Sequence, residues 1–328
     1  MSTVATSTVT AVSEPSASLA AAPRRWRLPV GDGHELQIYE WGEPTARPAM
    51  VLHGGPGSGC SPTLVRAFDL RAWRVIGVDQ RGAGLSTPAG ATAHNTTAHL
   101  LADLRTLRRA LGIARWVVVG GSWGATLALA HALDEPDAVA ALVLRGLFLA
   151  RREDVDAFFA AAVRDGEPAW RRWQSEADAT GVRLVEHLAA RLDHGDEAEQ
   201  RSIVTAWWRW EQSLQAAAAA ATTPPAFEAL RQRYRVQAHY LRHDCWLADP
   251  PLVERLHALP RVPTRLLHGA SDRVCPPQGA RLAHGRIAGS SLEIVDGAGH
   301  DPTHPAMAAA MAKALAGLTG AAQRGAAR

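Results

Sequence analysis

Apolar strand patterns and helical patterns alternate along most of the chain. Short runs of β-branched and other apolar residues, each ended by glycine or a polar loop, predict buried strands. These runs lie at residues 36–41, 49–53, 73–79, 117–119, 141–145, 264–268 and 291–296. Helices are predicted over residues 96–111, near 278–286 and over 305–318. Strands that alternate with helices predict an α/β fold, with a mostly parallel sheet covered on both faces.

The texture of the chain changes between residues 150 and 258. This segment is rich in alanine, arginine, glutamate and tryptophan, and it holds six of the 11 tryptophans. Few of its runs are strand-like, so it predicts an all-helical insertion, which we call the cap. A cap inserted between two strands would lie over the carboxyl edge of the sheet, where ligands bind in such folds. The predicted organisation is a disordered tail at 1–23, a core at 24–149 and 259–319, a cap at 150–258 and a second tail at 320–328.

Composition and charge exclude several classes of function. The 328 residues are 47% hydrophobic and 20% charged, which is typical of a soluble globule with a sizeable core. The net charge is only +3, and no basic stripe is interleaved with aromatic residues, so we expect no nucleic-acid partner. No apolar stretch is long enough to span a bilayer, so we expect no membrane partner.

The cysteines and the N-terminus bear on location. Three cysteines form neither a metal-ligand spacing nor a disulfide framework, and they suit a reducing compartment. Residues 1–22 contain no basic region followed by an apolar core, so we expect no secretory signal there. A disordered tail is favoured over a transit peptide. We therefore expect a cytoplasmic protein, and the sequence leaves its oligomeric state open.

The strand at 117–119 runs into a Gly-x-Ser-x-Gly pentad, Gly120 to Gly124, which a small-residue helix follows. This is the local pattern of a nucleophile elbow, a tight turn that holds a serine hydroxyl clear of the sheet. The flanking residues are glycine because side chains there would collide with the neighbouring strand and helix. Ser122 is thus the candidate nucleophile. The amide of Trp123, at the start of the helix, is a candidate donor to an oxyanion.

A serine nucleophile needs a base, and the base needs an orienting acid. In elbow architectures these follow the serine in the order acid, histidine. Asp272 comes directly after the strand at 264–268, and His300 follows the last predicted strand. The three strand ends converge in this fold, so we predict a triad of Ser122, Asp272 and His300. His304 is a nearby rival for the base.

The second oxyanion donor is expected in a loop after an earlier strand. His53-Gly54-Gly55-Pro56-Gly57 is such a loop, and its glycines let bare backbone approach a ligand. The amide of Gly55, or that of Gly54, is the candidate partner of Trp123.

Several blocks together resemble the proline iminopeptidase (prolyl aminopeptidase) family of α/β-hydrolases. They run from about residue 26 to 317 in the family's order, and they include core and cap. The blocks are His53–Gly57, Asp79-Gln80-Arg81-Gly82-x-Gly84-x-Ser86, Gly120–Gly124, Leu144–Leu149, Trp207-x-x-Trp210-Glu211 and His268-Gly269-x-x-Asp272. Generic hydrolases share the elbow but not this combination. The resemblance implies an α/β-hydrolase fold and a serine peptidase that releases N-terminal proline from peptides through an acyl-enzyme.

The resemblance also implies a substrate site beneath the cap, beside Gly54. Glu211 is the implied acceptor for the substrate's amino group, because a buried carboxylate among tryptophans needs a partner. An ion pair with Arg145 or Arg209 is the alternative for Glu211. Arg145 lies near the site in the family. Phe148 and Phe158 are implied walls for the proline ring, with ordinary core packing as their alternative.

One position departs from the family pattern. Where the family carries a second glutamate, this chain has Gln237, and Leu241 stands where an aromatic residue is frequent. A charged hydrogen bond exceeds a neutral one by roughly 1 kcal/mol, so the change is expected to weaken amine recognition about tenfold. An esterase, amidase or tailoring acyl hydrolase with a non-peptide substrate is therefore the alternative function. A ligand-binding protein on a hydrolase scaffold is a third. The triad needs no metal or organic cofactor, and the expected partner is a small peptide, amide or ester.

Overall fold

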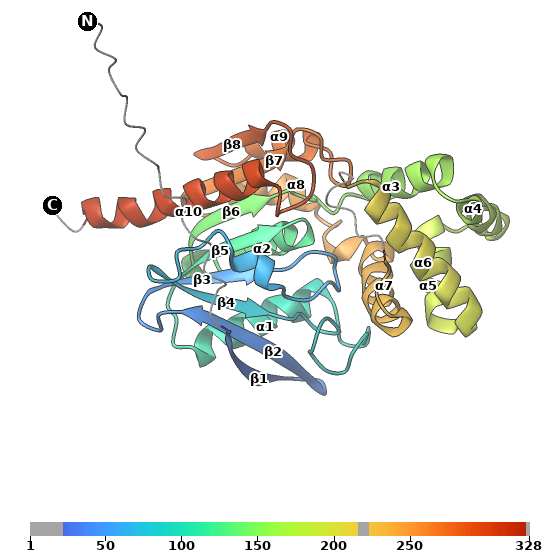
Figure 1. Cartoon of the computed structure of the whole chain (residues 1–328), viewed down its shortest axis with the longest axis horizontal. Coiled ribbons are helices and arrows are strands. Elements are labelled where there is room, and N and C mark those ends of the chain that lie inside the picture. The colour runs from blue at the N-terminus through green and yellow to red at the C-terminus, as the bar shows by residue number, and fades with distance from the viewer. Residues whose placement is uncertain (1–21, 216–222, 326–328) are drawn as a thin grey trace, which may run out of the picture.

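The computed structural model describes residues 22–215 and 223–325, and its centre is an eight-stranded sheet (Figure 1). The strand order is β1-β2-β4-β3-β5-β6-β7-β8. The strands are β1 (Arg24–Gly31), β2 (His34–Gly42), β3 (Arg47–Leu52), β4 (Trp73–Val78), β5 (Trp116–Gly121), β6 (Val139–Arg145), β7 (Thr264–Gly269) and β8 (Ser290–Val295). β1 and β2 pair antiparallel with their neighbours, and every pairing from β4 to β8 is parallel. The predicted mostly parallel sheet is confirmed.

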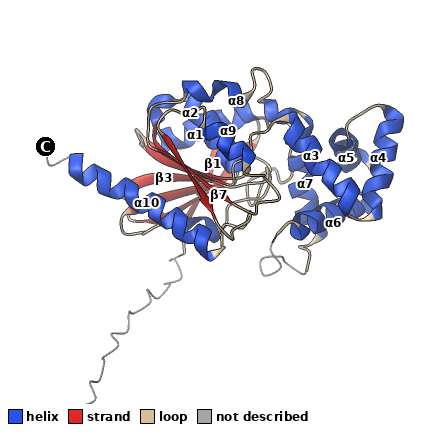
Figure 2. Ribbon diagram, turned by 90° about the horizontal axis from the view of Figure 1, so that it is seen from above, coloured by secondary structure: helices blue, strands red, loops and turns tan. Residues whose placement is uncertain are grey.

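Helices cover both faces of the sheet, as Figure 2 shows. One face is covered by α1 (Thr97–Ala110), α2 (Trp123–Asp134), α8 (Leu252–Arg255) and α9 (Gln278–His284). The other face is covered by α10 (Pro305–Gly325). All six residues of β5 are buried, as expected for a central strand with helices on both sides.

Five of the helices that the structure describes between β6 and β7 form the cap. They are α3 (Arg152–Asp165), α4 (Pro168–Thr180), α5 (Leu184–His194), α6 (Glu197–Ser213) and α7 (Phe227–Arg242). Their common core is aromatic, because Trp170, Trp173 and Trp207 are fully buried. Phe159 packs edge-on against Trp207 with ring centroids 5.0 Å apart. Such aromatic pairs stabilise a small helical layer beyond the area they bury.

The cap meets the core through α7. A β-carbon on Gly57 would lie 2.7 Å from the Arg233 carbonyl oxygen, and one on Gly82 would lie 3.0 Å from a Val236 methyl group. Two loops at the carboxyl ends of β3 and β4 therefore touch α7 closely, and glycine is needed at both contacts. This contact places the helices of the cap at the carboxyl edge of the sheet (Figure 1).

Three boundaries differ from those expected. β1 was missed because it is an edge strand with exposed arginines, and such a strand lacks an apolar run. The short helix η4 (Leu256–Ala258), inside the predicted cap, packs against α2 of the core. α10 continues past residue 318 into the predicted tail, because alanines there favour helix. The alanine run at 216–221 and the tail at 1–21 lie outside the described residues, as do residues 326–328. No helix of the described chain is long and apolar enough to cross a membrane.

Candidate active site

Ser122 sits in a strained turn between β5 and α2. Its φ of 57° and ψ of −124° lie outside the regions that a serine ordinarily adopts. A β-carbon on Gly120 would lie 2.2 Å from the Gly124 carbonyl oxygen, and one on Gly124 would lie 2.1 Å from the Leu52 carbonyl oxygen. The turn can therefore close only with glycine on both sides of Ser122. This is the geometry expected of a nucleophile elbow.

Asp272 and His300 meet on the loops that follow β7 and β8. His300 Nδ1 lies 2.7 Å from Asp272 Oδ2. The other carboxylate oxygen accepts the backbone N–H groups of Val274 and Cys275, at 3.0 and 2.8 Å. The Asp272 side chain is fully buried. Burial alone would raise its pKa, but the facing His300 and the hydrogen bonds outweigh it and hold the pKa of Asp272 below its ordinary value.

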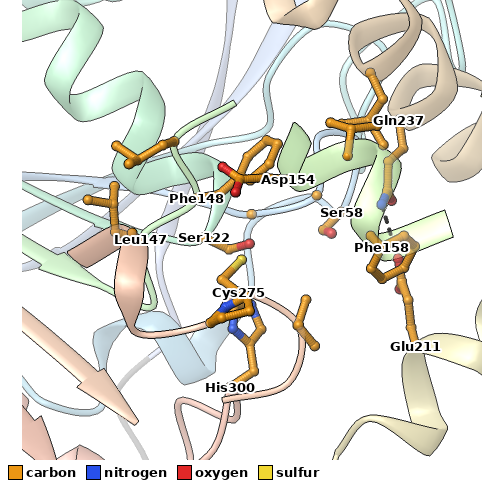
Figure 3. Close-up of a pocket in the computed structure, with 18 of the residues that line it drawn as sticks. Ser58, Ser122, Leu147, Phe148, Asp154, Phe158, Glu211, Gln237, Cys275 and His300 are labelled. Carbon is orange, nitrogen blue, oxygen red and sulfur yellow. Dashed lines mark hydrogen bonds between the residues drawn. The ribbon is translucent and has the colours of Figure 1, made fainter. Parts of the chain in front are cut away.

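Ser122 and His300 open into one pocket of about 290 Å³ between core and cap (Figure 3). His304, the rival base, does not line this pocket. Gly146 leaves room for the pair, because a β-carbon there would lie 3.2 Å from His300 Nδ1. Arg145 lines the pocket as well, and its guanidinium donates to the His300 backbone carbonyl. Arg145 thus holds the loop that carries His300.

The glycine loop after β3 passes beside the serine. A β-carbon on Gly54 would lie 3.4 Å from Ser122 Cβ and 3.9 Å from Ser122 Oγ. Gly55 has a φ of 110°, a conformation that only glycine adopts easily. Both glycines line the pocket, and Trp123 is the first residue of α2. The glycine loop and the start of α2, which carry the two candidate oxyanion donors, therefore both lie next to Ser122.

Gln80 connects these two donor segments. Its side-chain Nε2 donates to the His53 carbonyl oxygen at 3.1 Å, and its Oε1 accepts from Trp123 Nε1 at 2.8 Å. Its backbone N–H donates to His53 Nε2 at 3.1 Å. Gln80 is 5% exposed, so these contacts are shielded from water. It fixes the spacing between the glycine loop and the start of α2.

Replacing Gln80 with leucine is expected to lower both stability and turnover. The buried indole N–H of Trp123 and the His53 carbonyl oxygen would lose their partner. Each group that stays unpaired costs about 1–3 kcal/mol of unfolding free energy. Misplaced oxyanion donors should also lower kcat about tenfold. Gln80→Glu separates the two contacts, because it keeps the acceptor for Trp123 Nε1 but removes the donor to the His53 carbonyl oxygen. Urea unfolding and steady-state kinetics measure both effects. A leucine variant that is destabilised but has unchanged kcat would reduce Gln80 to a structural role.

The cap end of the pocket holds Glu211 on α6. Arg233 Nη2 donates to Glu211 Oε2 at 2.6 Å, and the Tyr234 hydroxyl donates to the same oxygen at 3.0 Å. Gln237 Nε2 donates to Glu211 Oε1 at 3.0 Å, the bond drawn in Figure 3. An ion pair was the alternative to amine binding for Glu211, and its partner is Arg233 rather than Arg145 or Arg209. Arg209 instead pairs with Glu167 on the cap surface.

Comparison with known proteins gives the family. The family described as alpha/beta hydrolase fold matches residues 48–304. The proline iminopeptidase of Xylella fastidiosa is 36% identical over 289 residues, which are 85% of this chain and 91% of that protein. The proline iminopeptidase of Arabidopsis thaliana is 34% identical over 86% of this chain and 76% of that protein. The chain belongs to the proline iminopeptidase family of α/β-hydrolases.

A solved member of the proline iminopeptidase family has the same fold. The crystal structure of the Mycobacterium smegmatis protein covers 91% of this chain and 100% of its own, with a TM-score of 0.62 at 20% identity. At that identity the likeness concerns the fold alone. The family assignment rests on the sequence relatives and on residues 48–304.

Several residues that line the pocket of the present protein were not predicted from its sequence. Asp154, which is bonded to Arg151, lines the pocket together with Ser58 and Cys275. Arg233 was missed although it precedes Gln237 by four residues, a spacing that puts both on one face of a helix. Phe148, Phe158 and Leu241, which the sequence analysis named, line the pocket too. Phe158 contacts Trp210 with ring centroids 6.3 Å apart.

One group of described residues offers metal-ligating atoms. Side-chain atoms of Asp32, His94 and His99 lie within 4.8 Å of one another. None of them lines the pocket with Ser122, and Asp32 is already paired with Arg81 at 3.2 Å. Nothing connects this group to the chemistry expected of a proline iminopeptidase.

Proposed function

We propose that the protein is a serine hydrolase of proline iminopeptidase type that releases N-terminal proline, or a similar small residue, from peptides or amides. The observation that carries the proposal is the hydrogen-bonded pair of Asp272 and His300, at 2.7 Å, on the pocket into which the strained Ser122 opens. The names of the sequence relatives supply the substrate class.

In this proposal Ser122 attacks the prolyl carbonyl carbon while His300 takes the serine proton. The tetrahedral oxyanion accepts hydrogen bonds from the amides of Gly55 and Trp123. His300 then gives its proton to the leaving amine, the carbon–nitrogen bond breaks and a prolyl ester of Ser122 remains. Water, deprotonated by His300, hydrolyses that ester and restores the serine. Asp272 holds the imidazole with Nδ1 protonated and stabilises the imidazolium.

The pocket supports recognition of a short N-terminal residue. Phe148 and Phe158 give it apolar walls, and the helices of the cap close its far end at Glu211 and Gln237. A substrate with further residues on the N-terminal side of the recognised residue would have to pass through that closed end. Three free cysteines support a reducing, cytoplasmic location as part of the same proposal.

A second function is favoured by one observation. Glu211 already holds Arg233, and Gln237 stands where the family pattern has a glutamate. A pocket with a neutral cap end also suits an esterase, amidase or tailoring acyl hydrolase with a non-peptide substrate.

Comparison of p-nitroanilides should separate the two functions. We expect L-proline p-nitroanilide to be cleaved at least about 10²-fold faster than N-acetyl-L-proline p-nitroanilide, as kcat/KM at pH 8. Acylation removes the imino N–H and leaves the buried Gln237 Oε1 at the cap end unpaired. L-Alanine p-nitroanilide should give an intermediate value, because it lacks the ring. Equal rates on the prolyl and acetylprolyl compounds, with faster cleavage of p-nitrophenyl acetate, would favour the esterase.

A further inference from the structure

Both oxygens of Glu211 already carry hydrogen bonds from the protein. Arg233 and Tyr234 donate to Oε2, and Gln237 donates to Oε1. The Glu211 side chain is 12% exposed, so water screens this group little. The guanidinium cancels the carboxylate charge, and the cap end of the pocket is electrically neutral before any substrate enters.

The polar atoms left without a protein partner at this end differ from those of a free carboxylate. Among the described residues that line the pocket, Gln237 Oε1, Gln215 Oε1 and Arg233 Nε are buried and have no hydrogen-bond partner. Gln237 is 7% exposed and lines the pocket, as Arg233 does. A buried amide oxygen accepts an N–H group without requiring a positive charge, and its unpaired state costs free energy until a ligand fills it.

We propose that the Arg233 guanidinium takes the place beside Glu211 that a substrate's protonated amine would otherwise fill. The enzyme therefore selects substrates whose recognised nitrogen is uncharged. This inference rests on the proposed chemistry at Ser122 and names the charge state of its substrate. An uncharged imino group donates its N–H to Gln237 Oε1. A protonated one brings a second positive charge beside Arg233, and two like charges a few ångströms apart in a partly buried site repel strongly.

The other titratable groups near Arg233 stay uncharged over the neutral range. Burial raises the pKa of the Tyr234 hydroxyl well above its ordinary value. His53, on the loop that faces α7, has its pKa lowered by burial. The remaining charges of the pocket are the pair of Asp154 and Arg151, Arg145 and the Asp272–His300 couple. These act on every substrate, so a ratio of two substrates cancels their titration.

The test compares L-proline p-nitroanilide with cyclopentanecarboxylic acid p-nitroanilide, which has the same ring size but no nitrogen. An α-amino group loses its proton near pH 8. In the wild-type enzyme we expect the ratio of kcat/KM values, prolyl to cyclopentyl, to rise about tenfold from pH 6.5 to 8.5. A ratio that is flat or falls over this range would overturn the inference, because an unpaired Glu211 would select the charged amine.

Variants assign the effect to the guanidinium. Arg233→Met removes the charge and should raise the ratio at pH 6.5 about tenfold. Gln237→Glu adds a carboxylate without touching Arg233 and should change the ratio in the same direction, which covers the case of an unfolded methionine variant. Arg233→Lys keeps the charge, and Arg209→Met removes an arginine of the cap surface. Both should keep the wild-type ratio. The inference would be contradicted if the ratio at pH 6.5 rose in neither Arg233→Met nor Gln237→Glu.

Failure of the proposed function gives a different result. If no variant cleaves either anilide while a fluorophosphonate still labels Ser122, the peptidase proposal fails. The charge preference is then measured by protection of Ser122 from labelling. L-Prolinamide should protect better than cyclopentanecarboxamide only at pH 8.5, and Arg233→Met should extend that protection to pH 6.5. Equal protection by prolinamide at both pH values in the wild type would contradict the inference.

Discussion

Ser122→Ala is expected to lower kcat for L-proline p-nitroanilide about 10⁶-fold, the largest effect of any single substitution in this protein. Without the hydroxyl no acyl-enzyme forms, and only the oxyanion donors and substrate binding remain to assist direct attack by water. Labelling by a fluorophosphonate should be lost in the same variant. Purified enzyme, corrected for wild-type contamination by active-site titration, is needed to measure a loss of this size.

The matched control for this loss is Ser58→Ala. Ser58 is a second hydroxyl on the same pocket, and it follows the glycine loop rather than the elbow. We expect it to lower kcat less than tenfold and to leave labelling intact. The Ser122 variant should fold, because alanine meets the same positive φ as serine and needs no more space. Fluorophosphonate labelling that persists in Ser122→Ala would place the nucleophile elsewhere and remove the basis of the proposed mechanism.

The core of the candidate site was predictable because its signals are local. Residues 120 and 124 must be glycine because a β-carbon at either position would make contacts under 2.5 Å. Five adjacent residues are therefore enough to predict the elbow. Asp272 and His300 follow recognisable strands, and parallel strands end at one edge of the sheet. Their convergence then follows from topology alone.

The cap end was not predictable in the same way. Which arginine pairs with Glu211 depends on how α6 and α7 rotate against each other, and aromatic packing around Trp207 and Tyr234 sets that rotation. The sequence offers many arginines at helical spacing on the cap. Two were considered and a third, Arg233, makes the contact. The bridging role of Gln80, a residue of the Asp79–Gly82 block, was not predicted for a related reason, because it depends on segments that are far apart in the chain.

Of the two edge strands, β1 was not predicted because little of it is buried, whereas β8 (Ser290–Val295) was predicted at 291–296. β1 pairs with β2 over residues 24–31, but three of its first four residues are exposed arginines, so it lacks the apolar run that predicts a strand. The interior strands β3 to β6, packed on both faces, were recognised within two residues of their observed ends. Sequence patterning is therefore most informative where the chain is most buried.

Asp272→Asn is expected to lower kcat about 10⁴-fold while leaving the shape of the pocket unchanged. The structure gives the reason. Asp272 Oδ1 accepts two backbone N–H groups, from Val274 and Cys275, so an asparagine must keep its carbonyl oxygen there. Its NH₂ group is then directed at His300 Nδ1. The imidazole must accept at Nδ1 and carry its proton on Nε2, and that nitrogen can no longer take the serine proton.

Stability and pH give independent checks on the Asp272 variant. The pKa of Asp272 is depressed in the folded protein, so the ionised carboxylate stabilises the fold fully above its unfolded pKa of about 4. That contribution declines as the pH falls below this value and is lost as the pH falls through the folded pKa. Asp272→Asn should therefore lower Tm at pH 7. At pH 3 the Tm difference between the variant and the wild type should be smaller. Thermal unfolding at pH 7 and pH 3 measures this. Asp272→Ala is the comparison: it offers His300 neither the carboxylate acceptor of aspartate nor the NH₂ donor of asparagine, and it should retain more activity than asparagine if the wrong tautomer is the main defect. Equal kcat in the two variants would assign the loss to the missing charge instead.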